Sequence, residues 1–501
     1  MQLAVIDLGS NSFRLVVFTA DGERWRRTDE IYEPVRIGEG LAATGALGEE
    51  PMERALSTLD VFAHFCAAAG LGPGDVDAVA TSAIRDASNA EAFLARARER
   101  TGLSIRVLSR EEEARYGYLA AVNSTTLKDG CVLDLGGGSM QLVQVAGRRE
   151  VTSASWRLGA VRMTERFLPG DGAASKKQLE KLSRHVTDKL ARAPWLDDCG
   201  PRLVGVGGTV RNLANAAQRA AGLPSIGVQG QCVSAAALAE LVERLAALPP
   251  AERARVAGIK PARADLILAG AVVIQATMRA GGFAALEATE AGLREGAFFA
   301  RHRAGSDGLL DDVRRRSVLT LAGQYAVDVA HTEHVARLAL GLFDETAAAG
   351  LHAGDPQERE LLWAASVLHD IGMSVDYDDH HKHSRYLILN AGLPGFSPAE
   401  LALVAQAARY HRKGTPDPGP LAGLLAGRRD RARLNRMAAL LRLAEDLERS
   451  RDQSVREAHV RVDGDTATLA LVSDDDTAVP RWAARREVEL FQRAFGRTLA
   501  V

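Results

Sequence analysis

The sequence predicts a protein of several structural units, with an α/β N-terminal half of two similar lobes and a mainly helical C-terminal half. Its 501 residues exceed what one hydrophobic core usually organises. A strand–turn–strand unit occurs twice in the N-terminal half, and helical periodicities with clustered histidines follow a polar linker at 304–308. The expected divisions are two lobes at 1–124 and 125–303, a helical domain at 309–455, and a small α+β segment at 456–501.

The repeated unit appears at an offset of 127 residues, as AVIDLGSNSFRLVVF from Ala4 and CVLDLGGGSMQLVQV from Cys131, and seven of fifteen positions are identical. Each copy is typical of an apolar strand, a tight turn opened by Asp-Leu-Gly, and a second apolar strand. The repeat therefore predicts two lobes that face each other across a cleft, with a ligand between the hairpins. The aligned polar pairs are Asp7 with Asp134, Gly9 with Gly136, and Ser12 with Ser139.

The two hairpin turns are candidate phosphate sites, because glycines let N–H groups approach an anion and Ser and Asn add donors. An aspartate beside a phosphate would be repelled without a cation, so Asp7 and Asp134 predict Mg²⁺ or a similar hard metal. The alternative is that Asp and Gly only shape the turns, and the matched pair argues against it. The turn candidates are Gly9, Ser10, Asn11 and Ser12 in the first hairpin and Gly136, Gly137, Gly138 and Ser139 in the second.

Further candidates for phosphate binding follow other predicted strands. RLVGVGGTVRNLA places Gly207, Gly208 and Thr209 at a helix N-terminus, which favours an anion, although a plain strand-to-helix connection explains the pattern equally well. VATSAIRDASN contains Arg85, which is either a phosphate ligand or a surface arginine. Arg14 of the first hairpin is the last candidate for phosphate binding.

An acidic first turn opens a predicted helix in SREEEARYGYLAAV, with Ser109 as the N-cap and Glu111, Glu112 and Glu113 behind it. These glutamates either face the cleft or only complement the helix dipole.

In this order and at these spacings, the motifs, with DLGGGS, GVGGTV and GLREG at 292–296, resemble the exopolyphosphatase/guanosine pentaphosphate phosphatase family. The resemblance implies the two-lobed ribonuclease H-like fold shared with actin, sugar kinases and Hsp70. It also implies Mg²⁺-dependent release of terminal phosphate from polyphosphate or guanosine pentaphosphate. The family's catalytic glutamate precedes an alanine, which falls on Glu113 as general base, with Glu112 as the alternative register.

One position departs from the family pattern. Where the family usually has a second carboxylate after Gly-Gly-Gly-Ser-Thr, this chain has Gln141. Glutamine carries no charge and cannot accept a proton, although it can orient water. The change is consistent with a slow enzyme, a shifted substrate, or a nucleotide-binding module with little turnover.

The C-terminal half predicts a second site, because histidines accumulate between His331 and His411. His334 lies on a helix with a Val335, Leu338 and Leu342 stripe, and His369 and Asp370 end another. The pattern resembles the HD superfamily, which implies a divalent transition metal held by His334, His369, Asp370 and Glu445, with Asp446 as the alternative to Glu445. Four further histidines either extend this metal site or bind phosphate beside Lys382, Arg412 and Lys413: His380, His381, His383 and His411. The alternative for each is an ordinary surface histidine or a hydrogen-bonded core histidine.

Composition excludes several partner classes. The formal charge of −2 gives no general affinity for nucleic acid or an anionic membrane, and no apolar run of about 18 residues predicts a membrane span. Four cysteines without CxxC spacing, and an N-terminus that begins directly in a strand pattern, favour the cytoplasm. A homodimer is expected. The leading hypothesis is an exopolyphosphatase-type hydrolase; the alternatives are a polyphosphate or alarmone sensor, activity in the HD-type site, and a sugar kinase.

Overall fold

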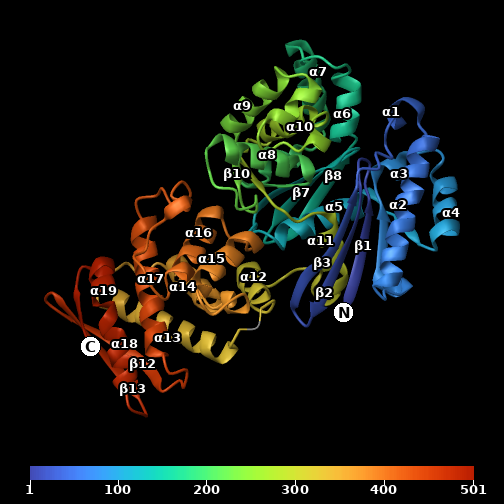
Figure 1. Ribbon diagram of the computed structural model, residues 1–501. Coiled ribbons are helices and arrows are strands. Elements are labelled where there is room, and N and C mark those ends of the chain that lie inside the picture. Colours follow the sequence, from blue (N-terminus) through green and yellow to red (C-terminus); the bar gives the residue numbers. More distant parts are fainter. Residues whose placement is uncertain (326) are drawn as a thin grey trace. The chain divides into compact units, whose positions relative to one another are not determined.

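The computed structural model describes residues 1–325 and 327–501 and divides into two compact units, Met1–Val313 and Arg314–Val501 (Figure 1). The first unit extends beyond the linker expected at 304–308. Leu310 and Val313 are buried against the first sheet, so the chain leaves the unit only after them.

The first sheet has the strand order β3-β2-β1-β4-β5. β1 pairs antiparallel with β2 and parallel with β4, so the predicted hairpin lies beside a crossover strand. Apolar residues point to both faces of β1, since Ala4 and Ile6 belong to one core and Leu3 and Val5 to another. The strands are β1 (Gln2–Leu8), β2 (Phe13–Asp21), β3 (Arg24–Glu33), β4 (Val76–Ala80) and β5 (Ile105–Val107).

The second sheet has the order β10-β11-β9-β6-β7-β8. Taken from β8 to β11, its strands correspond one by one to the strands of the first sheet from β3 to β5, and the antiparallel β10 is added at the edge beside β11. Asp7 pairs with Arg14 across the first hairpin, and Asp134 pairs with Gln141 at the same place in the second. The internal repeat of the sequence is therefore a repeat of structure. The strands are β6 (Gly130–Leu135), β7 (Met140–Ala146), β8 (Arg149–Trp156), β9 (Leu203–Val206), β10 (Cys232–Ser234) and β11 (Ala285–Ala288).

Two helices cross between the lobes. α5 (Arg110–Val122) packs on the second sheet, where Tyr118 and Leu119 share a core with Val132. α11 (Leu293–His302) packs on the first sheet through Phe298 and Phe299. Each of these helices therefore covers the sheet of the other sequence half, and the lobe boundaries expected at 124 and 303 stay a prediction.

The crossing of α5 and α11 depends on Gly296. A Cβ at this position would overlap the backbone carbonyl of Tyr116 in α5, which cannot move aside as a flexible side chain could. We expect Gly296→Ala to destabilise unit 1 by about 2–4 kcal/mol, as overpacking and backbone shifts in a core do. The measurement is the thermal unfolding midpoint. As a control, Gly341→Ala places a methyl group on an exposed helix surface with nothing within 4 Å, and helix propensity makes it neutral or stabilising; equal losses in both variants would contradict this account.

The outer faces of the two sheets carry the other helices of unit 1. α2 and α4 cover the first sheet, while the helices between β8 and β11 share the core of the second. These helices are α1 (Leu41–Thr44), α2 (Glu49–Ala68), α3 (Ser82–Asp86), α4 (Ala90–Thr101), α6 (Ala160–Phe167), α7 (Lys176–Leu190), α8 (Gly208–Ala220), α9 (Ala235–Ala246) and α10 (Ile267–Ala280).

Unit 2 is helical, with a small sheet at its C-terminal end. Within the α+β segment expected at 456–501, β12 and β13 form an antiparallel pair, and a third strand, β14, adds parallel to β13. The sheet and α19 pack against α13 and α17, so 456–501 belongs to the same compact unit. The elements are α12 (Val313–Ala322), α13 (Val329–Ala348), α14 (Pro356–Leu368), α15 (His380–Ala391), α16 (Pro398–Arg409), α17 (Asp430–Leu447), β12 (Val455–Asp463), β13 (Thr466–Ser473), α18 (Ala478–Ala484), α19 (Val488–Phe495) and β14 (Thr498–Ala500).

Within the described ranges, no helix is both long enough and apolar enough to cross a bilayer.

Candidate functional site

A pocket of unit 1 lies between the two hairpin turns and the turn that follows β9, where the repeat predicts a ligand. The β9 turn needs glycine, because Gly207 has φ 107° and a Cβ there would approach the Leu135 carbonyl. The lining includes Asp7, Gly9, Ser10, Asn11, Ser12 and Arg14 from the first hairpin, Asp134, Gly136 and Gly137 from the second, Gly207 and Gly208 from the third turn, and Glu113.

Glu113 projects from the first turn of α5 into this pocket and is 6 % exposed. Its Oε2 accepts a hydrogen bond of 2.8 Å from Arg85, and its Oε1 accepts one of 3.1 Å from the Ser139 hydroxyl. Arg85 also donates to the Leu108 carbonyl. The carboxylate is thus held in one orientation by residues of both lobes.

Glu112, the alternative register, has a different environment. Its side chain accepts from the Ser109 backbone N–H at 2.8 Å in a capping box and pairs with Arg106, outside the pocket. The glutamates of the acidic turn therefore differ in role: Glu112 caps the helix and Glu113 faces the cleft.

Gln141 lies behind the pocket and not in its lining. It is 1 % exposed, and its Nε2 donates to Ser139 Oγ at 3.0 Å, so it reaches Glu113 only through the Ser139 hydroxyl. This geometry does not support direct orientation of a water in the pocket by Gln141. Its Oε1 has no hydrogen-bond partner among the described residues.

Asp7 and Asp134 end the first strands of the two hairpins and line the same pocket. Burial raises the pKa of Asp7 to about 6 despite Arg294, whose Nη1 is 3.8 Å from Asp7 Oδ2. Burial, Glu113 and Asp7 together raise the pKa of Asp134 to about 7. Ionised carboxylates concentrated in this way are unstable without a cation, and hard oxygen ligands suit Mg²⁺, so the residues fit such an ion.

Three arginines of the pocket were not among the candidates from the sequence: Arg211, Arg263 and Arg294. Arg211 lies in the first turn of α8 and donates to the Glu290 carbonyl at 2.8 Å, and burial, Arg294 and Arg14 lower its pKa to about 10. Arg294 belongs to the GLREG segment already noted, and that signal could have identified it. With Arg14, they form a cationic wall suited to phosphate oxygens.

The structure keeps some expected phosphate ligands away from the pocket. Thr209 is 1 % exposed beneath Gly270, and Gly138 borders a smaller neighbouring hollow. Arg85 and Ser139 serve Glu113 as described, and they are not among the lining residues.

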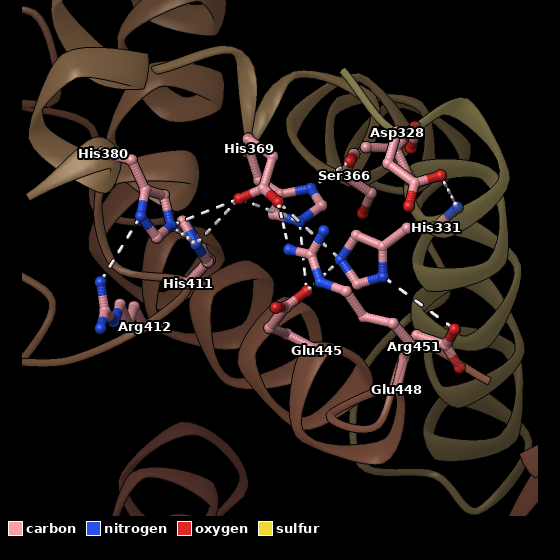
Figure 2. Close-up of polar contacts among 12 residues, drawn as sticks. Asp328, His331, Ser366, His369, His380, His411, Arg412, Glu445, Glu448 and Arg451 are labelled. Carbon is pink, nitrogen blue, oxygen red and sulfur yellow. Dashed lines mark hydrogen bonds and ion pairs between the residues drawn. The ribbon is translucent and has the colours of Figure 1, made fainter. Parts of the chain in front are cut away.

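Unit 2 contains a second group of polar side chains, centred on His369 and Asp370 at the end of α14. Figure 2 shows His369 among these side chains. His331 and His369 each place Nε2 on Glu445 Oε2, at 3.1 and 3.2 Å. His380 and His411 lie on the other side of Asp370, with Nε2 atoms 3.3 and 3.6 Å from its Oδ1. Glu445 makes these contacts and Asp446 does not; the metal-ligand role expected of Glu445 stays a prediction.

His334 was expected in this cluster, and the structure places it elsewhere. Its Nε2 faces the Val455 carbonyl at 3.0 Å and Glu448 at 3.3 Å, away from His369, and His331 of the preceding turn takes its place. Both histidines are buried on α13 one helical turn apart, so periodicity alone could not separate them. Of the other histidines, His380 and His411 join the cluster, whereas neither nitrogen of buried His381 has a hydrogen-bond partner among the described residues.

Comparison with known families agrees with the resemblance seen in the motifs. The model of the Ppx/GppA phosphatase family matches residues 20–303, and that of Ppx/GppA phosphatase domain III matches 313–486. The C-terminal match is to a domain of the same family, and the HD-type assignment stays a prediction.

Solved structures show the same fold. A member of the Ppx/GppA family from Aquifex aeolicus is 28% identical with a TM-score of 0.53, and the match covers 61% of this chain and 99% of that one. An exopolyphosphatase from Cytophaga hutchinsonii is 22% identical with a TM-score of 0.56, over 61% of this chain and 98% of that one, and shows the fold alone. Since the two family models together span most of the sequence, the chain belongs to the Ppx/GppA phosphatase family and is a phosphohydrolase of the two-lobed, actin-like type.

Proposed function

We propose that the pocket of unit 1 hydrolyses terminal phosphoanhydride bonds of inorganic polyphosphate, guanosine pentaphosphate or both, with Mg²⁺. The observation that carries the proposal is the position of Glu113. It is a buried carboxylate fixed by Arg85 and Ser139, and it faces two glycine turns that can receive a phosphate chain.

The residues divide the chemistry between them. Backbone N–H groups of the turns and the wall of arginines bind the phosphate oxygens, and the buried Asn11 Nδ2, which has no partner among the described residues, is a further donor. Glu113 accepts the proton of a water whose oxygen attacks the terminal phosphorus, and the bond to the bridging oxygen breaks. Mg²⁺ bound by Asp7 and Asp134 would offset the charge of the phosphates.

The proposal is tested by phosphate release from long-chain polyphosphate and from guanosine pentaphosphate, each with Mg²⁺ and with EDTA. Mg²⁺-dependent release from either substrate supports it, and the ratio of kcat/KM values identifies the preferred one. Tight binding of both, measured by calorimetry, with negligible release would instead favour the sensor.

Arg263 provides a test of phosphate binding separate from the chemical step. Its guanidinium lies against Gly208, so a Cβ at Gly208 would come within 2.7 Å of Nη2. We expect Arg263→Ala to raise KM for polyphosphate by about 10- to 100-fold with a smaller change in kcat, as the loss of one charge-assisted hydrogen bond implies. Arg255→Ala, at a side chain that is 79% exposed and pairs with Glu252, is the matched control and should leave KM unchanged. An unchanged KM in Arg263→Ala would remove this residue from the phosphate site.

A further inference from the structure

The polar cluster of unit 2 consists of six side chains from separate parts of the helical bundle. Figure 2 shows four histidines and Glu445 turned toward one another. His331 comes from α13, His369 and Asp370 follow α14, His380 begins α15, His411 follows α16, and Glu445 comes from α17. All except Glu445, whose side chain is 15% exposed, are nine-tenths or more buried. Six ionisable groups in a buried site need an explanation beyond packing.

Hydrogen bonds at the outer nitrogens fix the protonation of three of these histidines. The Nδ1 atoms of His369, His380 and His411 lie 2.5, 2.8 and 2.7 Å from the carbonyls of Ser366, Tyr377 and Ala408. A carbonyl can only accept, so each Nδ1 carries a proton, and in its neutral form each ring turns an unprotonated Nε2 toward the centre.

In the neutral form of these rings, the inward nitrogens are acceptors that face other acceptors. The Nε2 atoms of His380 and His411 are 3.0 Å apart, and the Nε2 of His369 is 3.2 Å from Glu445 Oε2. Asp370 Oδ1, in a side chain that is 4 % exposed, has no hydrogen-bond partner among the described residues. Lone pairs gathered at such distances are repulsive unless positive charge lies between them.

The ligand atoms form two sets that share Asp370, one with His331 and His369 and one with His380 and His411, each set lying within 4.8 Å. Glu445 Oε2 belongs to the first set by its contacts with both histidines. Carboxylates that bridge two ions about 3.5–4 Å apart are typical of two-metal hydrolases.

We propose that this cluster binds two divalent transition-metal ions bridged by Asp370, and that with them it forms a second hydrolytic centre acting on phosphate esters. His331, His369 and Glu445 hold the first ion, and His380 and His411 hold the second. Mixed imidazole and carboxylate ligands favour Mn²⁺, Fe²⁺, Co²⁺ or Zn²⁺ over Mg²⁺. The centre is distinct from the cleft in unit 1 and does not depend on the function proposed there.

The substrate class follows from the pocket beside the cluster. It is lined by His380, His411 and Glu445 together with three arginines, Arg412, Arg449 and Arg451. Arg451 donates to Asp370 Oδ2 at 3.0 Å, so one guanidinium already reaches the proposed bridge, and Arg412 lies over the exposed ring of Tyr377. Metal ligands, arginines and an aromatic ring suit an anionic phosphate carrying an organic group.

The reaction needs only water and the two ions. With both ions bound, a water between them would lose a proton to solvent and its oxygen would attack phosphorus; the bond from phosphorus to the ester oxygen would break, and the leaving oxygen would take a proton from solvent. The products are an alcohol and a phosphate, and nothing is oxidised or reduced.

Metal content is the first test, made on the full chain after EDTA treatment and dialysis against Co²⁺. Elemental analysis should find two more Co²⁺ ions per chain in the wild type than in Asp370→Asn, together with visible bands of nitrogen-ligated Co²⁺ that the variant lacks. His383→Gln, three residues after His380 and outside the cluster, is the control and should keep both ions. Equal Co²⁺ in wild type and Asp370→Asn, or a difference of one ion, overturns the two-metal centre.

A second measurement uses the wild type alone, because a variant could misfold. Bound Mn²⁺ should give the electron paramagnetic resonance spectrum of a spin-coupled pair of ions, and a spectrum of isolated ions alone would contradict the bridge.

Activity is the second test, with p-nitrophenyl phosphate and bis(p-nitrophenyl) phosphate as probes and Mn²⁺ as the metal. We expect Asp370→Asn to lower hydrolysis of at least one probe by about 100-fold or more, whereas His383→Gln keeps it. Glu113→Gln should lower polyphosphate hydrolysis and not ester hydrolysis, so failure of one centre is distinguishable from failure of the other. Two bound metals without hydrolysis of either probe would overturn the catalytic part of the proposal.

Discussion

Replacing Glu113 with glutamine is expected to lower kcat for phosphate release from polyphosphate by about 10²–10⁴-fold, the usual contribution of a general base. Glutamine preserves the size of the side chain, and its single carbonyl oxygen can accept from one of the two donors, Arg85 or Ser139, but it cannot take a proton from water. Substrate affinity should therefore change far less than kcat, which a comparison of steady-state constants measures.

Glu112→Gln is a closely matched control, since it makes the same change one residue away. Its carboxylate caps α5 and pairs with Arg106 outside the pocket, so the variant should lose at most a few tenths of a kcal/mol of stability and keep its kcat. A large loss of kcat in Glu112→Gln with none in Glu113→Gln would show that the other register is correct.

Asp134→Asn is expected to abolish most of the Mg²⁺-dependent activity, by about 10²–10³-fold, because one of two carboxylates that fit the ion is removed. The wild type should also show a pH dependence. Mg²⁺ binds the ionised carboxyl, and the pKa of Asp134 is about 7, so Mg²⁺ affinity should fall as the pH drops through 7. Titration of Mg²⁺ by calorimetry between pH 6 and 8.5 measures this.

The same pKa gives a stability change of opposite sign in the metal-free protein. A carboxyl whose pKa is raised on folding stabilises the folded state below its unfolded value, near 4, and that contribution is lost as the pH rises through about 7. Metal-free wild type should thus lose on the order of 1–3 kcal/mol between pH 4 and pH 8, and Asp134→Asn should lose less. Mg²⁺ at pH 8 should restore stability to the wild type only. A variant that still gains stability from Mg²⁺ as the wild type does would place the ion elsewhere.

Much of the fold could be predicted because its strongest signal is local. The two Asp-Leu-Gly hairpins share spacing and residue types, and the structure aligns Asp7 with Asp134 and Arg14 with Gln141. The exchange of α5 and α11 between the lobes could not be predicted in this way, since which sheet a helix covers depends on contacts between residues far apart in the sequence, such as Phe298 with Phe18.

The candidate sites show the same division. Glu113 could be found because a family motif marks it, whereas Arg263 stands in a segment without a motif and reaches the pocket only through the fold. Arg211 lies within the quoted RLVGVGGTVRNLA, but nothing in that pattern singled it out from the glycines. In unit 2, clustered histidines indicated a site, but helical spacing could not tell His331 from His334. The hydrogen bonds that turn Nε2 inward are visible only in three dimensions.

The central claim is that hydrolysis of polyphosphate occurs at Glu113 in unit 1. The most direct test is the initial rate of phosphate release from long-chain polyphosphate with Mg²⁺, measured side by side for the wild type, Glu113→Gln and Asp370→Asn. We expect a loss of at least about 100-fold in Glu113→Gln and a rate near that of the wild type in Asp370→Asn. Retention of activity in Glu113→Gln with loss in Asp370→Asn would contradict the claim and assign the hydrolysis of polyphosphate to the histidine cluster.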